Sequence, residues 1–149
     1  KNMKSKGEHG TILLVEDEEM LGELYTRTFE RTLYRFVWVK CTDDARAFLE
    51  KEKPDILFLD LIVPEKPHGI LDYGKRQGFE FLKQYRKYLP KNIIVFTNLD
   101  DNEDRQAARR LHVSDYMVKA NLLPKEIIQI ADKYIGSYAK KGRKTSARF

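Results

Sequence analysis

Apolar residues occur along the chain in five short runs, and a polar residue ends or follows each run. Runs that are short and apolar on both faces are typical of strands in a parallel sheet. Between the runs, apolar residues recur at the spacing of three and four positions that indicates amphipathic helices. The predicted strands occupy residues 11–15, 36–39, 56–59, 92–97 and 116–119.

Five strands that alternate with five helices predict an α/β fold, with helices on both faces of a parallel sheet. The first helix is expected to follow the acidic residues 16–19 and to run to about Tyr34, because acidic side chains favour a helix N-terminus. Thr42 or Asp43 is expected to cap the second helix, and Pro54 to end the segment. The other helices are predicted at residues 79–89, 100–111 and 124–135.

Composition indicates one domain. The chain has 149 residues, which suits a single core, and we expect a flexible segment at 1–9, the domain at 10–138 and a basic tail at 139–149. The net charge of +5 is concentrated at the ends, because residues 137–149 hold five basic residues and no acidic one. Such a tail is either solvated and disordered or a contact for nucleic acid or another polyanion.

Several classes of protein are disfavoured by what the sequence lacks. No apolar run approaches the roughly 20 residues that span a bilayer, and residues 1–10 show no secretory signal. Cys41 is the only cysteine, so an intrachain disulfide and a Cys-rich metal site are excluded. A reducing compartment suits this usage. We therefore expect a cytoplasmic protein with no membrane partner.

Polar side chains stand at the carboxyl ends of four of the predicted strands. Glu16 and Asp17 follow the first, Asp60 the third, Thr97 ends the fourth and Lys119 the fifth. In open parallel sheets the ligand crevice lies at this edge. Clustered carboxylates favour Mg²⁺, which typically uses one or two carboxylates plus a phosphate. A lysine and a hydroxyl can bind phosphate oxygens, so the set suits phosphoryl transfer.

The same residues carry a resemblance to a known family. Over about residues 10–136 the chain resembles the receiver domain of bacterial response regulators. The family implies a flavodoxin-like fold with strand order 2-1-3-4-5. It also implies Mg²⁺-dependent phosphoryl transfer to an aspartate from a sensor histidine kinase or a histidine phosphotransfer protein. The motifs are Ile12–Glu18, Leu59–Asp60 with Pro64 four residues later, Phe96–Thr97 and Tyr116–Lys119.

The resemblance assigns roles residue by residue. Asp60 resembles the phospho-acceptor. Glu16 and Asp17 resemble the acidic pair that holds Mg²⁺ together with Asp60 and the backbone carbonyl of Ile62. The resemblance implies a phospho-accepting signalling domain and not an enzyme, and we expect at most Mg²⁺-dependent self-phosphorylation and slow self-dephosphorylation.

Three further residues complete the implied site. Thr97 and Lys119 resemble the pair that binds the phosphoryl group, and Tyr116 resembles the aromatic switch that moves with the threonine. The family then reads the change on the face of the fourth helix, fifth strand and fifth helix, where a downstream protein binds. We expect a monomer or weak homodimer without an output domain.

The sequence departs from the family pattern at two loops. Ala120 stands where proline usually follows the lysine, so we expect a trans bond, since a cis bond without proline costs about 2.5–4 kcal/mol. Gly78 matches a family glycine but lies eighteen residues past Asp60, which makes the loop at 65–77 about ten residues longer. The insertion is either a tolerated surface loop, with His68 exposed, or a partial lid or partner contact.

Neighbours of the predicted site suggest a long-lived phosphoryl group. Ile62 and Leu99 lie two residues past Asp60 and Thr97, where polar residues in the family help to admit water. Apolar side chains at both positions predict slow self-dephosphorylation. Asn98 is larger than the small residue usual in the family, and is expected to crowd the entrance.

Three other classes of protein differ from a receiver in the residues that they need. A haloacid-dehalogenase-type phosphatase needs a second aspartate where Ile62 stands. A flavodoxin needs a hydroxyl-rich phosphate loop where this chain has the four acids at 16–19. A pseudo-receiver, an interaction module that is never phosphorylated, stays open.

Overall fold

The fold is a five-stranded parallel sheet between two layers of helices. The computed structural model describes residues 6–136. The strands pair in the order β2-β1-β3-β4-β5, and all pairs are parallel, which confirms the predicted flavodoxin-like α/β fold. Their bounds are Gly10–Val15 (β1), Tyr34–Val39 (β2), Ile56–Leu59 (β3), Asn92–Thr97 (β4) and Asp115–Val118 (β5).

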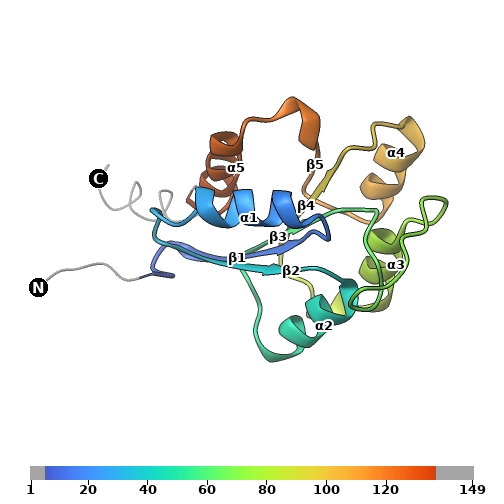
Figure 1. Cartoon of the computed structure of the whole chain (residues 1–149), viewed down its shortest axis with the longest axis horizontal. Helices are drawn as coiled ribbons and strands as arrows, with labels where there is room; N and C mark the ends of the chain where they lie inside the picture. Colours follow the sequence, from blue (N-terminus) through green and yellow to red (C-terminus); the bar gives the residue numbers. More distant parts are fainter. Residues whose placement is uncertain (1–5, 137–149) are drawn as a thin grey trace, which may run out of the picture.

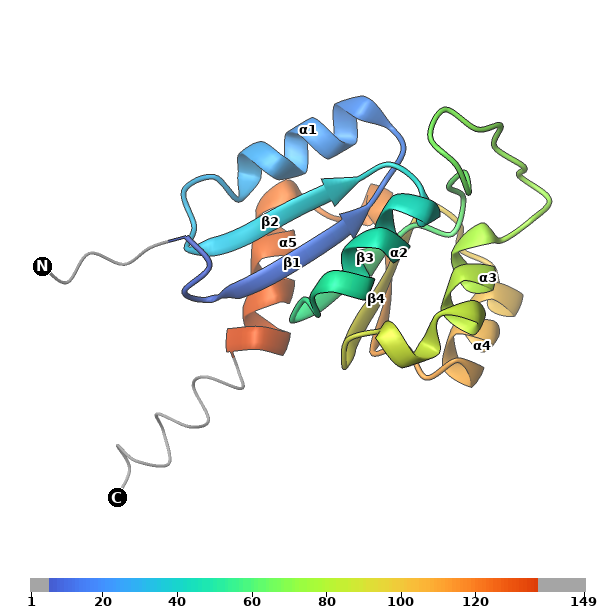
Figure 2. The ribbon, with the colours of Figure 1, turned by 90° about the horizontal axis from the view of Figure 1, so that it is seen from below.

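Helices cover both faces of this sheet (Figure 1). Helices α1 and α5 lie on one face, and α2, α3 and α4 on the other. The view turned by 90° shows β1 and β2 running side by side, with their arrowheads toward the same end of the molecule (Figure 2). The helices span Glu19–Thr28 (α1), Thr42–Lys51 (α2), Gln77–Gln84 (α3), Asn102–Arg110 (α4) and Pro124–Ala131 (α5).

Alternation along the central strands divides the core in two. In β1, Ile12 and Leu14 face the α1 and α5 layer, where they pack with Phe29 and Ile127. The intervening residues face the other layer and its helices α2, α3 and α4. Side chains point to opposite faces along a strand, so strands buried on both faces must be apolar throughout.

The first helix is shorter than predicted, because the chain turns after Phe29. The Thr32 hydroxyl donates a hydrogen bond to the Phe29 carbonyl at 2.7 Å and accepts one from the Tyr34 N–H at 3.2 Å. The Lys6 ammonium donates to the same carbonyl at 3.1 Å. These bonds satisfy the end of α1 and lead directly into β2, so Tyr34 starts a strand where the sequence predicted the end of a helix.

Other boundaries also differ by a few residues. Cys41, and neither Thr42 nor Asp43, caps α2, its sulfur accepting from the Asp44 N–H at 3.4 Å. The predicted third helix begins earlier, and its last part is a 3-10 turn at Arg86–Tyr88. Lys119 belongs to the 3-10 turn Lys119–Asn121 after β5, and α5 continues as the π-helical Asp132–Gly136.

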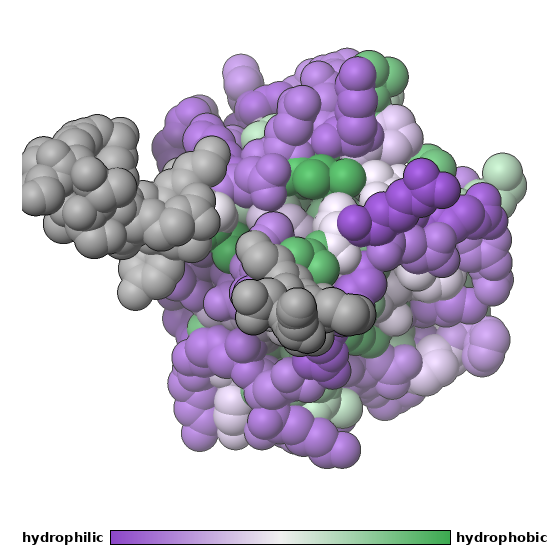
Figure 3. Space-filling model, turned by 90° about the vertical axis from the view of Figure 1, so that its left-hand side faces the viewer, coloured by the Kyte–Doolittle hydropathy of each residue, from purple (hydrophilic) through white to green (hydrophobic). Residues whose placement is uncertain are grey.

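The face at the amino ends of the strands is mostly hydrophilic, with scattered hydrophobic residues (Figure 3). No helix within residues 6–136 is both long and apolar enough to cross a membrane. The predicted basic tail at 139–149 and residues 1–5 of the predicted N-terminal segment lie outside the described residues.

Candidate functional site

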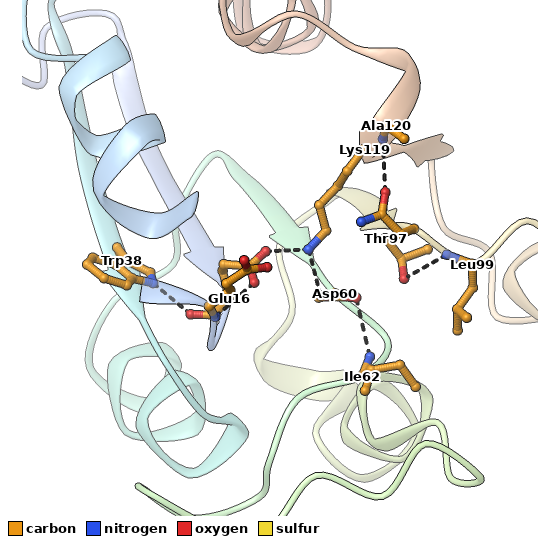
Figure 4. A network of polar contacts seen from close by, with 10 residues as sticks. Glu16, Trp38, Asp60, Ile62, Thr97, Leu99, Lys119 and Ala120 are labelled. Atoms are coloured by element: carbon orange, nitrogen blue, oxygen red, sulfur yellow. Dashed lines mark hydrogen bonds and ion pairs between the residues drawn. The ribbon is translucent and has the colours of Figure 1, made fainter. Parts of the chain in front are cut away.

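The carboxyl ends of the strands surround a cavity of about 360 Å³. Figure 4 shows the polar contacts at this edge, where side chains from the ends of β1, β3, β4 and β5 converge. The side chains that the sequence singled out there, apart from Tyr116 and Ala120, line the cavity, together with Glu18 and two residues of the inserted loop. The lining residues are Glu16, Asp17, Glu18, Asp60, Ile62, Leu71, Tyr73, Thr97, Asn98, Leu99 and Lys119.

Lys119 joins the ends of three strands. It follows β5, and its Nζ lies 2.7 Å from Oδ2 of Asp60 after β3 and 2.5 Å from Oε1 of Glu16 after β1 (Figure 4). The side chain crosses the end of β4, with Nζ 5.8 Å from the centre of the Phe96 ring. All three charged side chains are buried. A buried ion pair of this kind is favourable only with good geometry, which the short bonds provide.

The second oxygen of the Asp60 carboxylate points elsewhere. Oδ1 accepts a hydrogen bond from the Ile62 N–H at 3.3 Å. Gly78 holds this segment closely from the other side, since its N–H donates to the Leu61 carbonyl at 3.1 Å. A Cβ added at Gly78 would stand 2.6 Å from the Asp60 carbonyl oxygen. Glycine is therefore required here for close approach of the backbone.

The carboxylates of the site are short of positive charge. Burial raises the pKa of Glu16 to about 7, although Lys119 opposes the shift. Burial, and then the negative charge of Asp60, raise the pKa of Asp17. Burial alone would lower the pKa of Lys119, but the charges of Asp60 and Glu16 outweigh it, and the pKa is raised. One ammonium group thus serves three neighbouring carboxylates.

The excess of negative charge at the site would suit a divalent cation, if the carboxylates are arranged to bind one. Within residues 6–136 no group of three or more His, Cys, Asp or Glu side chains is gathered as a metal cluster, and Lys119 stands between Glu16 and Asp60. Mg²⁺ needs only one or two carboxylates, because it keeps several waters and takes phosphate oxygens. The half-buried Asp17, whose pKa is raised partly by Asp60, fits such a site. Asp17, Asp60 and the Ile62 carbonyl are the ligand candidates that leave the Lys119 pairs intact.

Thr97 and Tyr116 are linked through one residue of the loop after β4. The Oγ1 of the buried Thr97 accepts a hydrogen bond from the Leu99 N–H at 3.4 Å. The Tyr116 hydroxyl donates to the Leu99 carbonyl at 2.7 Å, and the Arg105 guanidinium lies 4.7 Å from the centre of the Tyr116 ring. A displacement of the Thr97–Leu99 backbone would therefore change the hydrogen bond of Tyr116.

The two unusual residues of the adjoining loops contact each other. The Asn98 Oδ1 accepts a hydrogen bond from the Ala120 N–H at 2.9 Å. The Lys119–Ala120 bond is trans, as expected. A proline at position 120 would have no N–H to donate. The hydrogen bond therefore requires both the Asn98 side chain and a residue other than proline at position 120.

The inserted loop borders the site, as expected, but through residues that the sequence did not single out. Leu71 and Tyr73 line the cavity. His68 is exposed and lies outside the lining, in agreement with the interpretation of an exposed histidine.

Sequence reasoning also missed Trp38, which supports the acidic end of β1. Its Nε1 donates to the Glu16 carbonyl at 2.7 Å (Figure 4), and a Cβ at Gly22 would overlap its ring. The sequence offered one signal for this contact: the single tryptophan lies in β2, which pairs with β1 in the sheet.

Comparisons with known proteins agree with this arrangement. The family model described as "Response regulator receiver domain" matches residues 12–132. The chain is 32% identical over 117 residues to the alkaline phosphatase synthesis transcriptional regulatory protein PhoP of Bacillus subtilis (strain 168), covering 78% of this chain and 44% of PhoP. The chain thus spans less than half the length of that relative.

Solved structures show the same fold. A receiver domain protein (CheY-like) from Methanospirillum hungatei JF-1 superposes with a TM-score of 0.72 at 17% identity, covering 88% of this chain and 97% of that one. The Mn²⁺-bound form of response regulator Rcp1 gives a TM-score of 0.62 at 23% identity, covering 83% and 90%. The match over residues 12–132 shows that the chain belongs to the response regulator receiver domain family of two-component signalling.

Proposed function

We propose that Asp60 accepts a phosphoryl group from a phosphohistidine. The observation that supports this most is the placement of its carboxylate, which is buried at the cavity with Oδ2 on Lys119 and Oδ1 on the Ile62 N–H. In the transfer, a carboxylate oxygen bonds to phosphorus while the phosphorus–nitrogen bond to the donor imidazole breaks. The protein has mainly to position the groups and compensate charge.

The neighbouring residues have distinct roles in this proposal. The Lys119 ammonium group already faces the acceptor. Once Asp60 is phosphorylated, this ammonium group pairs with one phosphoryl oxygen, and the Thr97 hydroxyl binds a second one. Asp17, Asp60 and the Ile62 carbonyl would hold Mg²⁺, and Glu16 is the other acidic residue of the site. A bound Mg²⁺ neutralises charge on the phosphoryl oxygens, and the Mn²⁺-bound Rcp1 is a structural neighbour that carries a divalent cation.

The response is read through Tyr116. When Thr97 turns toward the phosphoryl group it gives up its bond with the Leu99 N–H, and the Leu99 carbonyl shifts beneath the Tyr116 hydroxyl. The surface formed by α4, β5 and α5 changes as a result. A downstream protein binds this surface, and a sensor histidine kinase or a histidine phosphotransfer protein supplies the phosphoryl group.

Self-dephosphorylation is slow in this proposal. Ile62 and Leu99 both line the cavity, and neither side chain can orient a water molecule for attack on phosphorus. The lifetime of the aspartyl phosphate in purified protein tests this directly: minutes to hours are expected, and a half-life of seconds would refute it.

Beryllofluoride binding separates the receiver from a pseudo-receiver. Beryllofluoride occupies the position of a phosphoryl group on an ionised aspartate when Mg²⁺ is present. We expect saturable, Mg²⁺-dependent shifts in backbone amide NMR signals of residues 97–99 and 116, absent in Asp60→Asn. Glu52→Gln, at an exposed carboxylate paired with Arg35 and away from the reporter residues, is the control and should respond as wild type. No shift at high concentration would support the pseudo-receiver.

A further inference from the structure

The inserted loop contributes one wall of the acceptor cavity. Of residues 65–77, Leu71 and Tyr73 line the cavity that contains Asp60. Leu71 is half-buried, whereas Tyr73 is 71% exposed. An exposed segment of this kind keeps its place over a cavity only if something holds it there.

Arg76 contacts both this wall and helix α4. Its Nη1 donates to the Tyr73 carbonyl at 2.9 Å. The same guanidinium forms a two-pronged pair with Asp104 of α4, with Nε–Oδ1 at 3.0 Å and Nη2–Oδ2 at 3.1 Å. Asp101 lies 3.7 Å from Nη2. One side chain therefore ties the inserted loop to α4.

The burial of this pair distinguishes it from the other ion pairs of the surface. The side chain of Asp104 is 9% exposed and that of Arg76 is 26% exposed. Two parallel charge-assisted bonds fix geometry as well as charge, whereas exposed pairs contribute little. Helix α4 also carries Arg105, which lies against the Tyr116 ring, so the clamp connects the cavity wall to the helix beside Tyr116.

We propose that Arg76 is a positioning residue that clamps Leu71 and Tyr73 over the cavity as a lid, and that this lid prolongs the phosphorylated state. The inference rests on the proposed function of Asp60. In hydrolysis a water oxygen bonds to phosphorus while the phosphorus–oxygen bond to Asp60 breaks. Inorganic phosphate leaves, the carboxylate is regenerated and a proton of the water passes to solvent. The lid slows this step by restricting the approach of water.

The test measures the lifetime of the aspartyl phosphate in the full chain. Protein is phosphorylated with acetyl phosphate and Mg²⁺, the donor is removed, and loss of the phosphoryl group is followed by intact mass. Arg76→Ala should hydrolyse on the order of tenfold faster, because the lid opens when a two-pronged pair is lost. Arg76→Lys, which keeps the charge but not the fork, should fall between. Lys83→Ala, which breaks the exposed Lys83–Glu80 pair on α3, should match wild type.

Hydrogen exchange of the unphosphorylated protein provides the second readout. Arg76→Ala should speed exchange in residues 69–75 and also in 102–110, because the clamp joins both segments. Tyr73→Ala should shorten the lifetime of the aspartyl phosphate but leave hydrogen exchange in residues 102–110 unchanged. A general loss of stability would instead change both measurements. A wild-type lifetime in Arg76→Ala and Arg76→Lys would overturn the proposal. Absence of any phosphorylation in wild type would instead refute the proposed function of Asp60.

Discussion

The Asn98 side-chain oxygen accepts a hydrogen bond from the backbone N–H of Ala120 at 2.9 Å. The bond joins the loop after β4 to the turn after β5, next to Thr97 on one side and Lys119 on the other. It is possible only because residue 120 has an N–H. The turn that carries Lys119 is therefore tied to the loop that carries Thr97 by a contact between a side chain and the backbone.

Substitutions at these two positions should be strongly non-additive. Asn98→Ala and Ala120→Pro each remove the same hydrogen bond, so each should lower the free energy of unfolding by about 1 kcal/mol. The double variant should lose little more than either single one, because no bond remains to lose. Urea denaturation of the four proteins measures the coupling. Additive losses would mean that the bond does not stabilise the site.

Removing the charge of Lys119 should destabilise the fold. Lys119→Met leaves Glu16 and Asp60 buried without their shared cation, and breaking a buried pair in this way costs about 3–5 kcal/mol. Lys40→Met is the control, because the Lys40–Glu19 pair is exposed and such pairs contribute less than about 1 kcal/mol. Equal losses for the two variants in urea denaturation would contradict the role given to Lys119.

Tryptophan fluorescence should report Mg²⁺ binding. Trp38 is the only tryptophan of the chain, and its Nε1 is bonded to the carbonyl of Glu16, next to Asp17. Saturable Mg²⁺-dependent changes in emission are expected, reversed by EDTA, together with a rise in Tm, since a ligand of the native state stabilises it. Asp17→Asn should weaken the affinity at least about tenfold. An unchanged affinity in that variant would remove Asp17 from the metal site.

A methyl group at Gly78 should displace the acceptor. Gly78→Ala places a Cβ 2.6 Å from the Asp60 carbonyl oxygen, and overpacking of this kind costs about 1–3 kcal/mol. Gly74→Ala is the matched control within the same segment, because its Cβ would meet only Asp72 Oδ1, at 3.4 Å. We expect lower Tm and weaker beryllofluoride binding for Gly78→Ala alone. Similar behaviour of the two variants would show that the close approach does not matter.

The sequence predicted those parts of the molecule that leave a periodic signal. Strands buried on both faces, such as Ile56–Leu59, must be apolar throughout, and the parallel arrangement carries their polar end residues to one edge of the sheet. In the structure Asp60, Thr97 and Lys119 accordingly line one cavity at this edge.

Contacts between distant side chains and backbone groups leave no such signal. Lys6 satisfies carbonyls at the end of α1, and Trp38 reaches the carbonyl of Glu16 from the neighbouring strand. Arg76 and Asp104 are twenty-eight positions apart. From the sequence alone, each of these residues could equally lie at the surface without a specific partner. Only the folded chain shows which contact each residue makes.

Chemical localisation of the phosphoryl group tests the account most directly. Protein incubated with acetyl phosphate and Mg²⁺ is reduced with borohydride, which converts an aspartyl phosphate to homoserine, and the modified residue is located by peptide mass spectrometry. We expect homoserine at position 60, lost on omission of Mg²⁺ and absent in Asp60→Asn, while Asp100→Asn is labelled normally. Labelling at another carboxylate, or none in the wild-type protein, would contradict it.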